Sequence, residues 1–194
     1  MTRTDRMTTD EDAPLVARAR AGDRAAFDAL VIRHARCVAR LARRVVGNAE
    51  DAEDVVQETF VRVFQHLQNF RGRSSFRTWS MHIALNLAHD RLRTRRRTPS
   101  PRDLAAGIAP LDSLAPDHAA NGRDDRAALE RAVADLPPRQ RLTLLMKVVD
   151  GLTHVDIAKV LGTTESAARV YLSMARSTLR RRLASWFARD RRNT

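Results

Sequence analysis

Two stretches with helical spacing of apolar residues, separated by a proline-rich segment, limit the folds that this chain can adopt. Apolar residues recur every three or four positions from Pro14 to about Arg97 and again from Asp125 to about Phe187, which is the period of an α-helix. The segment between them holds four of the seven prolines and no sustained period, as is typical of a linker. We therefore predict an all-α protein with two small helical domains joined by a flexible linker. The predicted parts are a disordered N-terminus at 1–13, a first domain at 14–97, a linker at 98–124, a second domain at 125–187 and a basic tail at 188–194.

The charge of the chain points to a polyanionic partner. Its 35 Lys and Arg residues outnumber its 23 Asp and Glu residues, which gives a net charge of +12 at pH 7, and only Lys147 and Lys159 are lysines. An excess of positive charge of this size favours nucleic acid as the partner. A basic protein without such a partner remains an alternative.

The sequence lacks the features that would direct the chain into or across a membrane. Its first residues contain no apolar core of a signal peptide, and no apolar run approaches the length of a membrane span. The single cysteine, Cys37, cannot form an intramolecular disulfide, which suits a reducing compartment. We therefore expect a cytoplasmic protein.

A histidine and the cysteine lie close enough to raise the question of a metal site. His34 lies three residues before Cys37, on the same helical face. The pair supplies two ligands, fewer than a metal site needs. We therefore expect a buried thiol and no metal, and the redox activity of Cys37 is left open.

The segment DAEDVVQETF at 51–60 is acidic within a basic chain, with four acids in eight residues. Asn48 is a plausible N-cap for a helix that places acids in its first turn. At about 100° per residue, one apolar face contains Ala52, Val56, Phe60, Val63, Phe64 and Leu67. The opposite side contains Asp51, Asp54, Glu58 and Arg62, with Val55 among them. The acids are therefore predicted to point outward, toward solvent or a basic protein, whereas a helical metal site needs inward carboxylates and a Glu-x-x-His pair.

A helix predicted from Phe76 to about Arg95 carries apolar residues on two sides. Gly72 interrupts the chain before it, and Ser74 or Ser75 can cap its start. One apolar stripe contains Phe76, Trp79, Ile83, Ala84 and Leu87, and the other contains Met81, Leu85, Ala88 and Leu92. The narrow polar strip between them contains Thr78, His82, Asn86, His89 and Arg93. This pattern predicts a helix wedged between neighbours, whose polar strip faces a specific partner.

Nucleic acid is a chemically suitable partner for this strip and for the loop before it. His and Asn side chains can hydrogen-bond base edges, and the arginines at 91–97 can bind phosphates. The loop contributes Phe70, Arg71 and Arg73, and aromatic and Arg side chains can accept the unstacked bases of a single strand. Trp79 could instead belong only to the core, and the arginine run could be a solvated helix end.

The second half has the layout of a helix-turn-helix. A predicted helix at 139–149 ends at a glycine, and Thr153 with Asp156 resembles a capping box that opens a short helix. Gly162 then turns the chain, and Thr164 can cap a long second helix. Its buried stripe is predicted to contain Ala168, Leu172, Ala175, Leu179, Leu183 and Trp186. Its exposed flank, which could enter a major groove, contains Ser166, Arg169, Val170, Ser173, Ser177 and Arg180, with Arg176 at its border. An ordinary helical hairpin remains the alternative.

Four motifs occur together in one order: DAEDVVQETF at 51–60, FRTW at 76–79, IALNLAHDRLR at 83–93 and LPPRQR at 136–141. With the helix-turn-helix behind them, they resemble a bacterial sigma factor of the extracytoplasmic-function group, over about 15–97 and 129–183. The resemblance implies two helical DNA-binding domains that direct core RNA polymerase to promoters. It also implies a protein that is not an enzyme and needs no cofactor, and an association with the nucleoid.

The resemblance also assigns surfaces. It implies docking on the clamp helices of the largest polymerase subunit by Asp51, Asp54, Gln57 and Glu58. It implies recognition of the −10 element by Asn69, Phe70, Arg71, Arg73, Ser74, Trp79, His82, Asn86, His89 and Arg93. It implies recognition of the −35 element by Thr164, Ser166, Arg169, Val170, Ser173, Arg176 and Arg180. The middle of that second helix, at 169–174, is poorer in basic residues and His than in many relatives, so the −35 sequence stays open.

Further partners follow from the resemblance alone. The second domain would contact the flap of the second-largest subunit, the linker would run toward the RNA exit channel, and a separate anti-sigma factor would hold the protein inactive. Two other functions were weighed: a free-standing helix-turn-helix regulator that binds duplex DNA without polymerase, and a helical metalloenzyme acting on nucleic acid. The first leaves the acidic segment and the Trp79 helix unexplained, and the second needs inward carboxylates that the periodicity denies.

Overall fold

The computed structural model describes residues 11–97 and 123–190. Within these residues the chain forms helices and no strand, so the all-α prediction is confirmed. The helices are α1 (Ala13–Arg20), α2 (Arg24–Val46), α3 (Ala49–His66), the short 3₁₀ turn η1 (Leu67–Asn69), α4 (Phe76–Arg97), α5 (Arg123–Ala134), α6 (Pro138–Val148), α7 (His154–Leu161) and α8 (Glu165–Asp190). Most of the predicted disordered N-terminus and flexible linker, and the end of the basic tail, lie outside the described residues. None of the described helices has the length and apolar character that crossing a membrane requires.

Local sequence signals set the helix boundaries of the first domain. α2 begins after Asp23, whose side chain accepts a hydrogen bond from the Ala26 N–H at 3.1 Å, and it ends at Gly47 in the left-handed region, with φ 86°. α3 begins after Asn48, whose side chain accepts from the Asp51 N–H at 2.8 Å. A side-chain N-cap and a left-handed glycine at the C-terminus satisfy backbone groups that a helix end leaves unpaired. The N-cap at Asn48 is as the sequence predicts.

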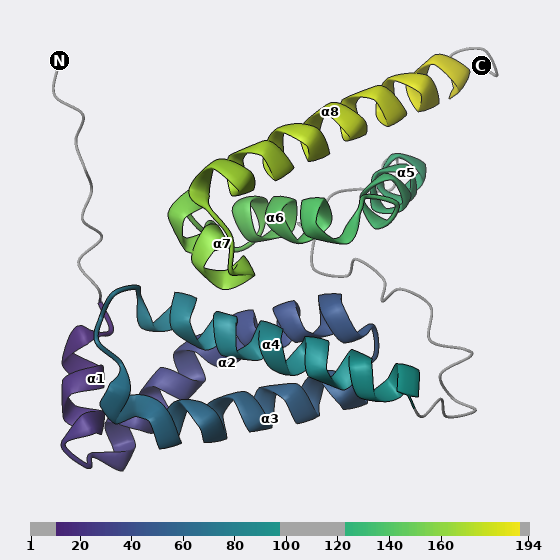
Figure 1. Ribbon diagram of the computed structural model, residues 1–194. Coiled ribbons are helices and arrows are strands. Elements are labelled where there is room, and N and C mark those ends of the chain that lie inside the picture. The colour runs from purple at the N-terminus through teal and green to yellow at the C-terminus, as the bar shows by residue number, and fades with distance from the viewer. Residues whose placement is uncertain (1–10, 98–122, 191–194) are drawn as a thin grey trace, which may run out of the picture.

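The first domain is a bundle in which α2, α3 and α4 each pack against the other two, and α1 packs against α2 (Figure 1). α4 is buried on two sides. Phe76 belongs to a cluster with Leu30 and Val63, whereas Met81 and Leu85 belong to a second cluster. The prediction of a helix wedged between neighbours is therefore confirmed.

The second domain contains the predicted helix-turn-helix. Thr153 caps α7 by accepting from the Asp156 N–H at 3.1 Å, and the turn after α7 passes through Gly162 with φ 60°. Thr164 then caps α8 by accepting from the Ala167 N–H at 3.2 Å. α8 packs against α5, α6 and α7. The second helix of the motif therefore contacts every other helix of its domain.

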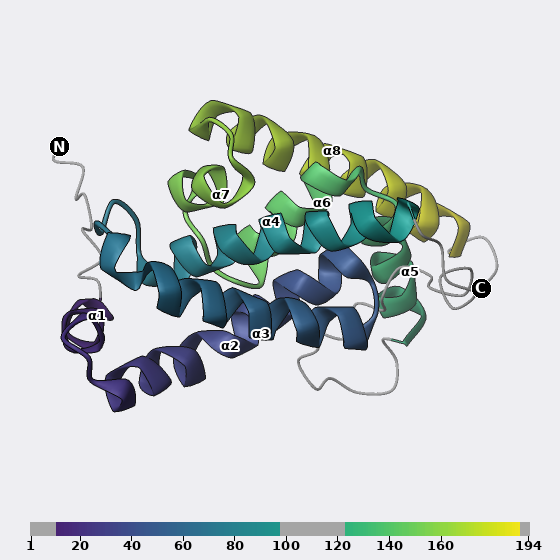
Figure 2. The same cartoon turned by 60° about the horizontal axis from the view of Figure 1, so that its bottom comes forward.

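The two domains share a core, which the sequence did not predict. α7 packs against α4, and both views show α6 and α7 lying over α2 and α4 (Figures 1 and 2). Leu142 and Ile157 of the second domain belong to the same buried cluster as Val38, Leu41 and Leu85 of the first. We call this placement of α7 over α4 the closed arrangement.

Candidate functional site

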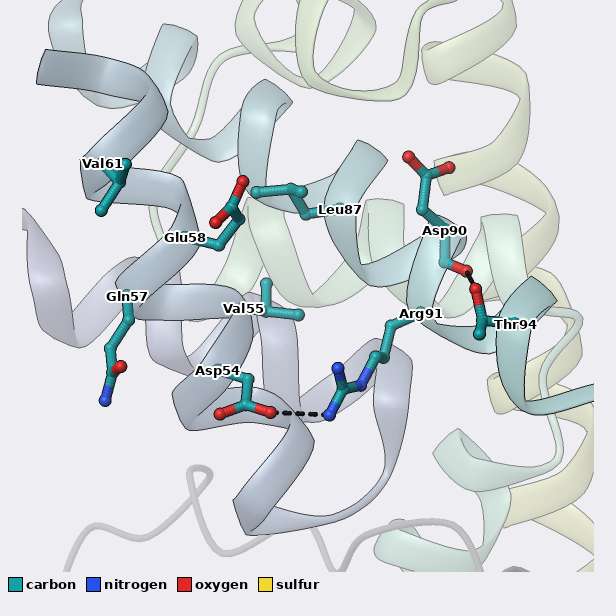
Figure 3. A pocket seen from close by; sticks show the side chains of 9 residues that line it. All are labelled: Asp54, Val55, Gln57, Glu58, Val61, Leu87, Asp90, Arg91 and Thr94. Atoms are coloured by element: carbon teal, nitrogen blue, oxygen red, sulfur yellow. Dashed lines mark hydrogen bonds and ion pairs between the residues drawn. The ribbon is translucent and has the colours of Figure 1, made fainter. Parts of the chain in front are cut away.

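An acidic groove lies between α3 and α4, with a volume of about 500 Å³ (Figure 3). Its polar lining comprises Asp54, Gln57, Glu58, Asp90, Arg91 and Thr94. Its apolar lining comprises Val55, Val61 and Leu87. The carboxylates of Asp54 and Glu58 are about half exposed, at 52% and 49%. Because carboxylates border apolar side chains here, the groove suits a partner that is basic and partly apolar.

Asp51 departs from the prediction, because it does not point outward with the other acids. Its side chain is only 12% exposed and accepts from Arg91 Nε at 2.7 Å and from Arg95 Nη1 at 2.9 Å. Val55, predicted on the same outer side, is also buried, at 3% exposed. Both predictions were wrong because α4 packs against this side of α3 and brings its arginines over the first turn.

The environment of Asp51 keeps its carboxyl group ionised. Burial alone would raise its pKa, but the hydrogen bond from Asn48 and the guanidinium groups of Arg91 and Arg95 outweigh burial, so the pKa of Asp51 lies below its ordinary value. Asp51 therefore anchors the start of α3 to the end of α4. It is a structural part of the acidic segment and not part of its exposed surface.

Asp54 and Glu58, the exposed acids of α3 in the groove, each form an exposed ion pair. Asp54 accepts from Arg91 Nη2 at 2.6 Å, and Glu58 accepts from Arg62 Nε at 2.8 Å within the same helix. Exposed pairs of this kind contribute little to stability, because water already solvates both charges. A basic partner can therefore replace these arginines without a large loss.

Three groove residues on α4 were not assigned a role from the sequence. Leu87, Asp90 and Thr94 line the groove with Arg91. Their spacing of three and four places them on one face of α4, which the sequence shows. The sequence does not show that this face lies beside α3, so the groove could not be assembled from it.

The loop before α4 is held by an aromatic cluster. Phe70 is buried, and its ring centroid lies 4.9 Å from that of Trp79 and 6.1 Å from that of Phe76. Trp79 is half-buried within this cluster. Other predicted loop residues are differently placed: Asn69, Arg71 and Arg73 are exposed, whereas Ser74 is half-buried. The structure thus places Phe70 in the core, where its ring packs near Trp79 and Phe76, and leaves the arginines after it exposed.

The polar strip of α4 is covered in its first half. Thr78 is 1% exposed, and its hydroxyl donates to Asp156 Oδ1 at 3.1 Å. His82 Nδ1 lies 3.1 Å from the Val160 carbonyl oxygen, to which it donates, and its Nε2 accepts from Asn86 Nδ2 at 3.2 Å. This half of the strip therefore faces α7 of the second domain. The specific partner that the pattern predicts is, in the closed arrangement, the chain itself.

The second half of the strip is more exposed, although His89 and Arg93 also border a cavity beside α6. Asn86, His89 and Arg93 are exposed, and Arg93 pairs with Asp90. Burial lowers the pKa of His89, and the positive charges of Arg139 and Arg93 lower it further. The His89 imidazole is therefore held neutral near pH 7, as a base-reading histidine requires if one of its nitrogens is to accept a hydrogen bond.

One buried carboxylate joins the domains, in what we call the Asp150 contact. The Asp150 side chain is fully buried and accepts from Arg40 Nη2 at 2.7 Å and from Arg44 Nη1 at 2.6 Å. The Asp150 backbone carbonyl accepts from Arg77 Nη2 at 2.6 Å. Lys159 adds a bond to the Arg73 carbonyl oxygen at 2.5 Å. Hydrogen-bonded buried charges of this kind are strongly destabilised when one partner is removed.

The predicted flank of α8 is exposed as a continuous surface. Its exposed residues are Thr164, Ser166, Arg169, Val170, Ser173, Arg176 and Arg180. Ala168, Leu172 and Ala175 are buried on the opposite side, as predicted. Arg169 pairs with Glu165 one turn earlier, with Nε 3.0 Å from Glu165 Oε1. The flank is therefore available to a duplex even in the closed arrangement.

The cysteine and histidine of α2 are structural. Cys37 is buried, as expected, and its thiol donates to the His34 carbonyl oxygen at 3.0 Å. Burial raises the pKa of the Cys37 thiol. The His34 ring nitrogen Nε2 lies 2.7 Å from Asp12 Oδ2, which ties the start of α1 to α2. Among the described residues, no group of three His, Cys, Asp or Glu is placed to hold a metal ion.

Two family models match the chain in order. The model of Sigma-70 region 2 matches residues 30–98, and that of Sigma-70 region 4 matches residues 126–179. The chain is 33% identical to the RNA polymerase sigma-H factor of Pseudomonas aeruginosa, over 89% of this chain and 94% of that protein. It is 32% identical to the ECF RNA polymerase sigma-E factor of Escherichia coli, over 87% of this chain and 92% of that protein.

Solved structures share the fold. CnrH, solved in complex with the cytosolic domain of CnrY, is 28% identical with a TM-score of 0.65, over 90% of this chain and 97% of that one. The sigma factor RpoE of Bartonella quintana, solved with the anti-sigma factor NepR, is 22% identical with a TM-score of 0.63, over 81% of this chain and 96% of that one. By its two matched regions and its full-length relatives, the chain belongs to the extracytoplasmic-function group of sigma-70 RNA polymerase sigma factors.

Proposed function

We propose how this sigma factor, a subunit that binds core RNA polymerase and directs transcription initiation at promoters, divides its work among three surfaces. The acidic groove docks on the polymerase, the loop and polar strip of α4 read the −10 element, and the exposed flank of α8 reads the −35 element. The protein acts by binding and carries out no chemistry of its own. Its place is the cytoplasm, in association with the nucleoid.

The observation that carries the docking role is an acidic groove left open on a basic protein. Asp54, Glu58 and Asp90 would repel DNA phosphates, although the chain as a whole carries a net charge of +12. The same carboxylates attract Lys and Arg, and Val61 and Leu87 supply apolar contact. We assign the clamp helices of the largest polymerase subunit as the partner, since a helix is the element that fits between two others.

The −10 role is assigned to exposed and covered residues together. Arg71 and Arg73 in the loop suit phosphates, and Asn86 and His89 suit base edges. Thr78 and His82 belong to the same strip but contact the second domain in the closed arrangement. Reading by the full strip therefore requires α7 to leave α4, whereas docking through the groove does not. We propose that polymerase binding comes first and −10 recognition second.

The −35 role rests on the flank of α8 and on the tether between the domains. Arg169, Arg176 and Arg180 on this flank suit phosphates, and Ser166 and Ser173 suit base edges. Two modest DNA contacts on one chain act together, because the first raises the local concentration of the second. The second domain also contacts the flap of the second-largest subunit in this proposal.

We further propose that a separate anti-sigma factor controls this protein. The fold is shared with RpoE, which was solved in complex with the anti-sigma factor NepR. Affinity purification of the tagged chain from its own cells tests this. Recovery of only the free chain or its polymerase complex, under every growth condition, would contradict it.

Charge reversal tests the docking surface. Asp54→Arg and Glu58→Arg, singly and together, are compared with Asp28→Arg, an exposed acid on α2 outside the groove. We expect the double variant to bind core polymerase about 100-fold more weakly, since charge pairs across an interface are worth several kcal/mol, and the Asp28 variant to bind as wild type does. Equal losses in all variants would remove the groove from the proposal. Tight duplex binding by a wild-type chain that fails to bind core polymerase would favour the free-standing regulator.

A further inference from the structure

A basic cavity lies at the seam between the two domains, apart from the acidic groove. Its volume is about 440 Å³. Arg44 from α2, His89 and Arg93 from α4, and Arg141 from α6 line it, and no carboxylate is among its lining residues. Apolar side chains complete the wall, Leu142 of α6 among them. The cavity therefore exists only while α6 lies against α2 and α4.

Arg44 is a buried guanidinium whose hydrogen-bonding capacity is only partly used. Its side chain is 8% exposed, and Nη1 donates to Asp150. Its Nε and Nη2 are buried and have no partner among the described residues. Arg40 shares the same Asp150 carboxylate, so a single negative charge faces two guanidinium groups. Unpaired buried donors on a cation are unfavourable, and Arg44 lines the cavity, so an anion bound there would offset part of this cost.

Arg141 adds a second cation to the cavity, and among the described residues no ion pair joins it to an acid. It is half-buried, with Nη1 donating to the Ala134 carbonyl oxygen at 2.8 Å. Burial is what lowers the pKa of Arg141. α6 begins at Pro138 without a side-chain cap, and Pro138 itself lines the cavity. The uncapped start of a helix carries partial positive charge, so it strengthens the same field.

We propose that this cavity binds a phosphate-bearing small molecule of about nucleotide size. Guanidinium forks bind phosphate oxygens with short, charge-assisted hydrogen bonds. Arg141 and the start of α6 supply positive charge here, and Arg44 and Arg93 keep further N–H donors although they pair with Asp150 and Asp90. The volume falls within the range of about 300–1,000 Å³ typical of small-molecule sites, and the apolar wall suits an organic group beside the phosphate. Because both domains line the cavity, its occupant stabilises the closed arrangement. This site goes beyond the proposed function and does not rest on it.

Pyrophosphate is the probe, titrated calorimetrically into the full-length chain without polymerase. Wild type is compared with Arg141→Gln and with Arg131→Gln, which removes the same charge from an exposed position on α5 outside the cavity. We expect saturable binding that Arg141→Gln weakens about ten-fold, as loss of a charge-assisted hydrogen bond does, and that Arg131→Gln weakens less than about two-fold. Bound pyrophosphate should also slow the amide exchange of α7. Exchange requires the two domains to separate, and separation would release the bound pyrophosphate.

Two further arms make the result decisive. Arg141→Lys keeps the positive charge but loses the two-pronged guanidinium group, so it should bind pyrophosphate with intermediate affinity. This variant replaces Arg141→Gln if Arg141→Gln misfolds. A short single-stranded oligonucleotide separates the possible phosphate sources. If the oligonucleotide binds with the same dependence on Arg141 and pyrophosphate does not bind, the cavity takes a nucleic-acid backbone and the small-molecule proposal is overturned. Absence of saturable pyrophosphate binding, or equal losses in the Arg141 and Arg131 variants, also overturns it.

Discussion

The acidic groove and the polar strip flank the same helix, yet the closed arrangement treats them differently. On the groove side, Asp54 and Glu58 are about half exposed. On the strip side, Thr78 is buried against Asp156 and His82 is bonded to Val160. One side of α4 is thus accessible to a partner from solvent, whereas the other side is covered by the second domain.

The difference lies in how each surface satisfies its polar groups. The groove uses exposed ion pairs, which a partner can exchange at little loss. The strip uses buried hydrogen bonds beside a shared apolar core, which are lost only if the domains separate. A surface of the first kind can meet its partner at once, whereas the second must first be released.

Removing Asp150 should have the largest effect, because it should uncover the polar strip and make both sides of α4 accessible. Asp150→Ala leaves Arg40 and Arg44 facing one another without their carboxylate, so we expect the closed arrangement to lose about 3–5 kcal/mol. The chain without polymerase should then bind single-stranded −10 DNA more tightly, and amides of α7 should exchange faster. Asp135→Ala, which removes an exposed pair with Arg182, is the control and should change neither. Unaltered exchange and DNA binding in Asp150→Ala would show that this contact does not keep the strip covered.

Replacing Asp51 should distinguish the buried acid from the exposed acids of the acidic segment at 51–60. Asp51→Asn removes a buried charge held by Arg91 and Arg95, so we expect the free energy of unfolding at pH 7 to fall by about 1–2 kcal/mol. Asp54→Asn, at an exposed acid, should lower it by less than about 1 kcal/mol. Urea denaturation of both variants measures the difference, and equal losses would count against the structural role of Asp51.

The pH dependence of the stability difference between wild type and Asp51→Asn tests the role of Asp51 further. The folded pKa of Asp51 is lowered, so its contribution is present above the unfolded value of about 3.9 and is lost as pH falls through the folded value. The stability difference between wild type and Asp51→Asn should therefore shrink between about pH 4 and the lower folded pKa. A difference that stays constant down to pH 2 would mean that the Asp51 charge is not what stabilises the fold.

The smallest effect on stability is expected at Glu58. Glu58→Gln removes an exposed pair with Arg62 in the same helix, so urea denaturation should show a change of no more than about 0.5 kcal/mol. The same variant should still weaken binding to core polymerase, because the groove loses a carboxylate. A stability loss well above that figure, with normal polymerase binding, would assign Glu58 to the fold and not to the interface.

Local chemistry explains what the sequence could predict. The caps at Asn48 and Thr153, and the turn at Gly162, involve residues within four positions of one another. Hydrophobic periodicity likewise located the two buried sides of α4. Such features depend on spacing along one helix, which the sequence states directly.

What the sequence could not predict depends on contacts distant along the chain. Asp51 is held inward by Arg91 and Arg95, which follow it by 40 and 44 positions. Thr78 is covered by Asp156, which follows it by 78 positions. A helical wheel shows which residues share a face but not which neighbour meets that face. The groove, the Asp150 contact and the seam cavity all arise from such meetings, so they became visible only with the fold.

The loop between α3 and α4 combines a fixed backbone with free side chains. Phe70 stacks near Trp79 at one end, and Ser75 caps α4 at the other by accepting from the Thr78 N–H at 3.1 Å. Arg71 and Arg73 between them are exposed and take no part in the aromatic cluster. Substitutions at these two exposed positions can therefore change what the loop contacts, while the backbone that presents the side chains stays the same.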